Sequence, residues 1–192
     1  MGENEVCIDD ELPFEIPDSW RWTYIGNIAF VTKLAGFEYT KYIAPSLCQQ
    51  GIPLFKGKNV QNGSLVECFE SFIPEAVSDE LWRSQITRRC LLTPYVGSIG
   101  NIAIFEGKYK AHLGSNVGKI ELYAKEIIEE FILFYLRSQT GYEQLTKHKK
   151  ATAQESISIE AIRDVLIPIP PLAEQIRIVE TIERVIKHTN KL

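Results

Sequence analysis

The closing stretch of the chain, LIPIPPLAEQIRIVETIERVIKHTNKL over residues 166–192, marks a change from strand to helix. Pro170 and Pro171 cannot continue a strand, but proline is tolerated in the first turn of a helix. Glu174 follows in that first turn, where a carboxylate suits the positive end of the helix dipole. The sequence therefore predicts an apolar extended segment that ends at residue 169 and a helix over residues 170–192.

Apolar side chains spread over about half of the circumference of this predicted helix, at about 100° per residue. On the other side Glu180 is spaced i,i+4 from Arg184, a pairing that supports a solvated face. Two interpretations of the wide stripe stay open: the helix packs on its own domain, or part of it faces a second helix, from another copy or from elsewhere in a longer chain. The residues predicted for a helix interface are Leu172, Ile176, Val179, Ile182, Val185 and Ile186.

The composition is that of an ordinary globular domain with an appendage: 192 residues, of which 45% are hydrophobic and 24% charged. No apolar run approaches the roughly 18 residues that would cross a bilayer, and the acidic N-terminus does not resemble a signal peptide. We therefore expect a cytoplasmic protein without membrane contact.

Charge is distributed unevenly along the chain. Residues 1–20 contain no lysine or arginine and have a balance of −7, whereas residues 21–192 carry 21 basic and 18 acidic groups. We interpret residues 1–13 as a flexible acidic leader, and the body that follows as mildly basic. This balance alone neither requires nor excludes a nucleic-acid partner.

The cysteines Cys7, Cys48, Cys68 and Cys90 form no Cys-x-x-Cys pair. Wide spacing in a chain rich in core residues is typical of reduced thiols. Because structural zinc sites normally show paired ligands, the sequence predicts no metal and no cofactor.

Between the two ends, strands and helices are mixed without βαβ regularity, which predicts an α+β fold with a mixed sheet, followed by the long C-terminal helix. Alternating Trp20, Trp22 and Tyr24 indicate a strand with a buried aromatic face. Further strands are predicted over residues 52–55, 65–73, 90–93, 102–105 and 119–123. Helices are predicted from a cap near Ser78, over residues 127–145 with a break at Gly141, and from Ser158 to Val165, whereas residues 32–50 are expected to form a long loop.

A search for catalytic motifs finds no Walker A loop, Gly-x-Gly-x-x-Gly, His-Glu-x-x-His or Gly-x-Ser-x-Gly. Glu106 and Lys108, with Asp79 upstream, could be interpreted as the carboxylate pair and lysine of a metal-dependent nuclease. A Glu-x-Lys triplet is common by chance, so we rank this hypothesis last and predict that the chain is not an enzyme.

Four loop segments carry the side chains that DNA recognition needs, which are cations for phosphates and amides for base edges. Only convergence of these segments on one face would give them weight, and the sequence cannot show it. The predicted DNA-binding residues are Lys33, Tyr39, Lys41, Tyr42, Lys56, Lys58, Asn59, Gln61, Asn62, Ser98, Asn101, Lys147, Lys149 and Lys150.

Three segments resemble one known family when they are taken in order: LPFEIPDSWRWTYIGNI at residues 12–28, LLTPYVGSIGNIAIF at 91–105 and IPIPPLAEQIRIV at 167–179. They resemble the entry, the central turn and the exit of a target-recognition domain in the DNA specificity subunits of Type I restriction-modification systems. The Pro-Pro-Leu-Ala-Glu-Gln block is the most specific of these matches. The chain departs from the family pattern at Cys90, where an aspartate often opens the central strand, and it carries one such domain and one helix where a family member normally carries two.

The resemblance implies a non-catalytic subunit with a role in bacterial defence. Residues 14–169 would form a target-recognition domain that reads one half of a bipartite site on double-stranded DNA. Residues 170–192 would form the conserved spacer or dimerisation helix, a coiled coil that holds methyltransferase (M) and restriction (R) subunits and a second recognition domain or second copy. The alternative interpretation is a helix-mediated protein-interaction adaptor without a DNA role.

Overall fold

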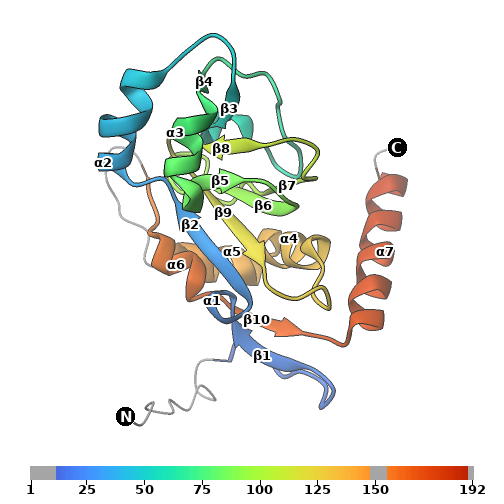
Figure 1. Cartoon of the computed structure of the whole chain (residues 1–192). Coiled ribbons are helices and arrows are strands. Elements are labelled where there is room, and N and C mark those ends of the chain that lie inside the picture. The colour runs from blue at the N-terminus through green and yellow to red at the C-terminus, as the bar shows by residue number, and fades with distance from the viewer. Residues whose placement is uncertain (1–11, 148–154, 190–192) are drawn as a thin grey trace, which may run out of the picture.

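The computed structural model describes residues 12–147 and 155–189, and Figure 1 shows their arrangement. Strand β1, Arg21–Tyr24, pairs antiparallel with β10, Leu166–Ile169, so the first and last strands lie side by side at one end of the molecule. The short helix α1, Ile25–Ile28, follows β1 directly, and Ile25 is fully buried. Trp22 is half-buried against Phe14, so the predicted aromatic strand is confirmed.

A four-stranded antiparallel sheet forms the centre, with strand order β2-β9-β6-β7. Its strands are β2, Ala29–Lys33; β9, Val117–Leu122; β6, Cys90–Pro94; and β7, Ala103–Phe105. Three helices pack a shared apolar core with this sheet: α4, Glu129–Arg137; α5, Gln139–Thr146; and α6, Ile159–Arg163. Ile120, Leu91 and Ile132 are among the fully buried side chains of that core.

A second four-stranded sheet has the order β4-β3-β8-β5 and a core of its own around Phe55 and Leu113. Its strands are β3, Ile52–Phe55; β4, Phe72–Ile73; β8, Ala111–Leu113; and β5, Gln85–Ile86. Strands β3 and β8 run parallel and the other pairs antiparallel, so the sheet is mixed. The predicted α+β class with a mixed sheet is confirmed.

Helix α7, Leu172–Thr189, begins directly after Pro170 and Pro171, as predicted. The backbone N–H groups of Glu174 and Gln175 both donate to the carbonyl of Pro171, which closes the first turn. Figure 1 shows α7 at the edge of the molecule, joined to β10 and standing on the side of α4. Among the described residues, no helix is long and apolar enough to cross a bilayer.

The loop predicted over residues 32–50 is largely helical, which corrects that expectation. Helix α2, Gly36–Glu38, continues into a π-helical turn, Tyr39–Ile43, and a 3-10 turn, Ala44–Ser46. The carboxylate of Glu38 accepts from the N–H of Ala35 at 2.9 Å and pairs with Arg83 at 2.8 Å. An arginine 45 positions away therefore stabilises this helix, and local periodicity does not reveal it.

Three other predicted boundaries were wrong. Helix α3, Glu75–Glu80, starts after Pro74, and Ser78 lies buried inside it instead of capping it. The break between α4 and α5 falls at Ser138, whose hydroxyl accepts from the N–H of Gly141. Of residues 65–73, only the last two form strand β4.

Candidate nucleic-acid interface

Two loops far apart in the sequence, residues 57–64 and 95–101, pack directly against each other. The N–H of Gly63 donates to the carbonyl of Ile102 at 2.9 Å. The side-chain amide of Asn101 donates to the carbonyl of Val60 at 3.2 Å. The Asn62-Gly63 turn and the turn at Gly97-Ser98-Ile99-Gly100, which bring Asn62, Ser98 and Asn101 together, thus form one surface.

A cleft of about 270 Å³ opens where these loops meet the junction of α4 and α5. Gly100 adopts φ +91°, and a Cβ at this position would come within 2.7 Å of the ring of Tyr142. Gly63 adopts φ +87°, and a Cβ there would lie 2.9 Å from Nη1 of Arg137. Both positions therefore favour glycine through their backbone conformation, and at Gly100 a Cβ would also press on the Tyr142 ring. The cleft is lined by Asn62, Ile99, Gly100, Asn101, Arg137 and Tyr142.

Arg137 is a functional candidate that the sequence did not point to. It is the last residue of α4 and is half-buried, and in the part of the chain that the structure describes its guanidinium makes no ion pair or hydrogen bond. The side-chain amide of Asn62 is likewise unpaired among the described residues. A guanidinium offers forked donors that fit phosphate and guanine edges, so an unpaired one in a cleft is a natural ligand contact.

Lys33 adjoins the same loops. Its ammonium lies 4.5 Å from the ring centroid of Tyr95, within the range of a cation–π contact. Burial raises the pKa of the Tyr95 hydroxyl, so the ring stays neutral at pH 7. The N–H of Tyr95 donates to the carbonyl of Asn116, and Gly57 packs closely on Asn116. Lys33 is therefore connected to the loop of residues 57–64 through Tyr95 and Asn116.

Asn59 serves the fold of its own loop. It is only 3% exposed, its oxygen accepts from the N–H of Lys56 at 2.9 Å, and its amide group donates to the carbonyls of Val66 and Cys68. Both of its N–H donors are therefore engaged, and almost none of its surface can reach a base. The sequence prediction treated Asn59 as a base-contacting residue, and the structure buries it because the short 3-10 helix Gly57–Asn59 needs an internal cap.

The lysines of this loop are tethered weakly. Lys56 donates to the hydroxyl of Ser71 at 2.8 Å. Lys58 pairs with Glu70 while both side chains stay more than half exposed, and the hydrogen bond from Lys58 lowers the pKa of Glu70. An exposed ion pair is screened by salt and contributes little to stability, so Lys58 can exchange its partner for a phosphate. Gln61 is exposed, as is Ser98 in the neighbouring turn.

The remaining predicted DNA-binding residues do not join this cleft. Tyr39, Lys41 and Tyr42 lie on the π-helical turn after α2, which Figure 1 shows beside α3 and on the side of the molecule away from α7. There the ammonium of Lys41 rests 4.9 Å from the ring centroid of Tyr42, whose hydroxyl raises the pKa of Lys41. Lys147 follows α5 and lines a different hollow, of about 430 Å³, with Tyr24 and Asp164. Lys149 and Lys150 lie outside the described residues.

The acidic residues considered for a nuclease are engaged by different cations. Asp79 accepts from Lys110 at 2.7 Å, and Glu106 accepts from Arg89 at 3.0 Å. Within residues 12–147 and 155–189, no group of three or more His, Cys, Asp or Glu is placed to hold a metal ion. The geometry therefore offers the nuclease hypothesis no support.

The apolar stripe of α7 divides into a covered and an uncovered part. Val179 is buried against the central core and Ile182 is half-buried. The other residues of the predicted helix interface are exposed: Leu172, Ile176, Val185 and Ile186, with Val185 at 60%. Toward its C-terminal end, α7 is separated from α4 by a hollow of about 400 Å³, lined by Leu133, Phe134 and Ile186 among others.

These features define a class of protein: an α+β binding domain with a loop-built polar cleft and an outgoing helix whose apolar side chains are partly uncovered. The chain belongs to the Type I restriction modification DNA specificity domain family, whose model matches residues 38–192. The family resemblance is thereby confirmed, and two of the three segments that carried it, residues 91–105 and 167–179, lie within the matched range.

Curated relatives include two specificity subunits from Escherichia coli. The specificity subunit of the Type I restriction enzyme EcoBI is 21% identical over 95% of this chain, and that of EcoEI is 27% identical over 96%. Among solved structures, the HsdS subunit from Thermoanaerobacter tengcongensis matches with a TM-score of 0.66 and 17% identity over 93% of this chain. The chain spans 38% of the EcoBI subunit, 32% of the EcoEI subunit and 40% of the HsdS chain.

Proposed function

We propose that this chain is the DNA-reading part of a specificity subunit in a Type I restriction-modification enzyme. In this role it binds double-stranded DNA, reads one half of a bipartite target and has no catalytic activity of its own. The observation that carries the proposal is the convergence of the loops of residues 57–64 and 95–101 with the unpaired Arg137, in a chain of the DNA specificity family.

The contacts divide by chemistry. Arg137, Lys33, Lys56 and Lys58 are suited to phosphates because each carries a positive charge: Arg137 lines the cleft, and the three lysines lie in or beside the two loops that build it. Asn62, Gln61 and Asn101 are suited to base edges, since a side-chain amide offers a donor and an acceptor together. Asn59 is left out of this set because its amide is buried and satisfied.

We propose that α7 pairs with a second helix and, with it, docks methyltransferase and restriction subunits. Leu172, Ile176, Val185 and Ile186 support this because they are exposed and apolar. Covering such side chains contributes roughly 1.5 to 3 kcal/mol each. The second helix comes from another copy or from further sequence of the same subunit. The enzyme as a whole would act in the cytoplasm.

Exposed apolar residues on α7 would equally suit an adaptor without a DNA role. The adaptor hypothesis gives the polar cleft no task, whereas DNA reading uses both the cleft and the helix. We therefore keep DNA reading as the proposed function.

Methylation-site mapping in cells that carry the complete system tests this proposal directly. A second set of cells carries the same system with Gln61→Ala and Asn62→Ala in this chain. We expect the methylated sequence in these cells to be relaxed in one half of the target and unchanged in the other. Methylation of an unaltered sequence set at unaltered frequency would show that this loop does not read DNA.

The pairing of α7 has its own test. The double change Ile176→Glu with Val185→Glu is a cleaner test than a change at half-buried Ile182, because both side chains are exposed in the single chain. In sedimentation, we expect this variant to lose the faster-sedimenting paired species that the parent forms, and to remain a slower-sedimenting monomer.

A further inference from the structure

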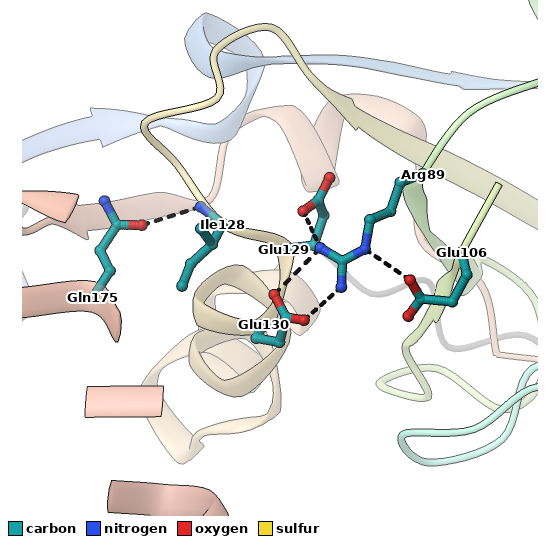
Figure 2. Close-up of polar contacts among 6 residues, drawn as sticks. All are labelled: Arg89, Glu106, Ile128, Glu129, Glu130 and Gln175. Atoms are coloured by element: carbon teal, nitrogen blue, oxygen red, sulfur yellow. Dashed lines mark hydrogen bonds and ion pairs between the residues drawn. The ribbon is translucent and has the colours of Figure 1, made fainter. Parts of the chain in front are cut away.

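The side chain of Gln175 is buried where α7 joins the domain. It is 0% exposed and forms three hydrogen bonds, which use both its oxygen and its amide group. Its oxygen accepts from the N–H of Ile128 at 3.1 Å, and its amide group donates to the carbonyls of Glu126 and Pro170, each at 2.9 Å. Figure 2 shows Gln175 reaching from α7 to Ile128 at the start of α4. One side chain thus joins three backbone segments: the first turn of α7, the Pro-Pro joint and the entry to α4.

The first turn of α4, which follows Ile128, is held from its other side by Arg89. Figure 2 shows the guanidinium of Arg89 between Glu129, Glu130 and Glu106. These contacts raise the pKa of Arg89, chiefly through its hydrogen bond to Glu130, so the guanidinium stays charged. Arg89 directly precedes β6, whose residues are all buried, and Glu106 directly follows β7. The start of α4 is therefore fixed to the central sheet.

Beyond this joint, the domain holds α7 less firmly. Gln175 and Val179 are the buried side chains of the helix, and both lie in its first half. Further along, residues 183–189 are exposed and the hollow against α4 intervenes. The direction in which α7 leaves the domain is therefore set mainly by the contacts of its first two turns.

We propose that Gln175 is the positioning residue that fixes the angle between α7 and the recognition domain, and that it thereby sets the number of base pairs tolerated between the two halves of the DNA target. This inference rests on the proposed function, because a spacer length has meaning only if the chain reads a half-site. The ligand that this joint positions is the second half-site on the same DNA duplex, whose distance from the first half-site depends on the direction of α7.

The lever is long enough for small rotations to matter. Helix α7 has 18 residues and is therefore about 27 Å long. A rotation of about 10° at its base moves its far end by about 5 Å, which exceeds the spacing of about 3.4 Å between successive base pairs. A joint that loosens by this amount would accept spacers one base pair too short or too long.

The test uses the assembled restriction-modification enzyme containing the full-length subunit, with duplexes that carry both mapped half-sites. The spacer is the natural one, or is one base pair shorter or longer. With Gln175→Ala, we expect the preference for the natural spacer to fall by about fivefold or more, while each half-site is still read correctly. Gln175→Met keeps the length of the side chain without its hydrogen bonds, and it carries the same test if the alanine variant does not fold.

Gln144→Ala is the matched control. Gln144 also makes three hydrogen bonds, to both backbone groups of Leu166 and to the hydroxyl of Tyr135, but it lies on α5 and ties that helix to β10. A general loss of stability would affect both variants alike, so only a direct effect on α7 makes Gln175→Ala lose spacer preference while Gln144→Ala retains it. Equal spacer preference in the Gln175 variants and the parent overturns the inference and leaves DNA reading intact. A parent enzyme that binds neither half-site overturns the proposed function, and this inference with it.

Discussion

At its first turn, α4 has Glu129 and Glu130 held by Arg89, whereas at its other end Arg137 has no partner among the described residues. Both ends are charged and both contact loops from distant parts of the chain. At the first turn each of these charges has a partner of opposite sign within the protein, and these contacts fix the start of α4 to the central sheet. At the last turn the guanidinium of Arg137 lies in a cleft with the side-chain amide of Asn62, and neither group has a partner among the described residues, as expected of groups that bind a ligand.

The first prediction breaks this comparison by removing the arginine at each end of α4. Arg89→Ala leaves three carboxylates facing one another, and we expect the free energy of unfolding to fall by about 2–3 kcal/mol, since charged hydrogen bonds contribute about 1.5–3 kcal/mol and this site is partly exposed. Arg137→Ala should change it by less than about 0.5 kcal/mol. Urea unfolding of the two variants beside the parent measures both values, and equal losses would show that Arg137 also belongs to the architecture.

The second prediction applies the same contrast to two asparagines three positions apart in one loop. Asn59→Ala removes a buried cap and leaves the N–H of Lys56 and the carbonyl of Val66 without partners, so we expect a loss of about 1–3 kcal/mol in unfolding free energy. Asn62→Ala should be neutral within about 0.5 kcal/mol but should relax the methylated target. Unfolding curves and methylation mapping together separate the two roles. Should Asn59→Ala relax the target without loss of stability, the assignment of the two residues would be reversed.

This pair also shows where inference from sequence ends. Both asparagines lie in a basic, amide-rich stretch, and nothing in their spacing distinguishes the buried one from the exposed one. Burial of Asn59 depends on the carbonyls of Val66 and Cys68 folding back over it, and that return path is set by β4 pairing with β3. Arg137 was missed for a similar reason, because its relevance comes from loops that precede it by several tens of residues in the sequence.

Features governed by local chemistry were predicted well. The joint at Pro170 and Pro171 and the helix that follows depend on what proline permits, and the structure confirms them. The strand from Cys90 was predicted from its apolar run and is confirmed.

Features that depend on distant contacts or on capping were predicted less well. The helical segment after β2 was missed because Arg83 stabilises it from a distance. The break in the helix after β9 was misplaced to Gly141, since the sequence did not show that Ser138 caps the next helix.

The third prediction concerns the open end of α4 alone. In the assembled enzyme, Arg137→Ala should weaken DNA binding by about fivefold to tenfold and reduce the salt dependence by about 0.9 per lost phosphate contact. The target sequence should stay the same if Arg137 contacts a phosphate. Lys125→Ala is the matched control, because Lys125 is an exposed cation near the opposite end of α4. Binding curves at several salt concentrations give the slope, and an identical slope for both variants and the parent would remove Arg137 from the interface.

The last and smallest effect is a pH dependence at the satisfied end. Burial raises the pKa of Glu130, but the hydrogen bond from Arg89, a backbone hydrogen bond at Glu130 and the positive charge of Arg89 together outweigh it, so the pKa of Glu130 in the folded chain lies below its ordinary value. Because the unfolded chain binds the proton first, the stabilising contribution of this carboxylate is fully present above about pH 4.3, the ordinary value for glutamate, and is lost as the pH falls through the folded pKa. Glu129 and Glu106 face the same guanidinium, so Arg89 keeps partners when Glu130 is protonated, and the loss should be small.

Glu130→Gln should therefore be slightly less stable than the parent at pH 7, and its free energy of unfolding should fall less steeply between pH 5 and pH 3. Glu126→Gln, at an exposed carboxylate in the segment before α4, should follow the parent. Urea unfolding across this pH range measures both slopes. If the slope of Glu130→Gln matched that of the parent, Arg89 would hold α4 through Glu129 alone, and Glu106 would be its contact beside β7. The fixed end of α4, on which the orientation of α7 depends, would then rest on fewer contacts than the geometry indicates.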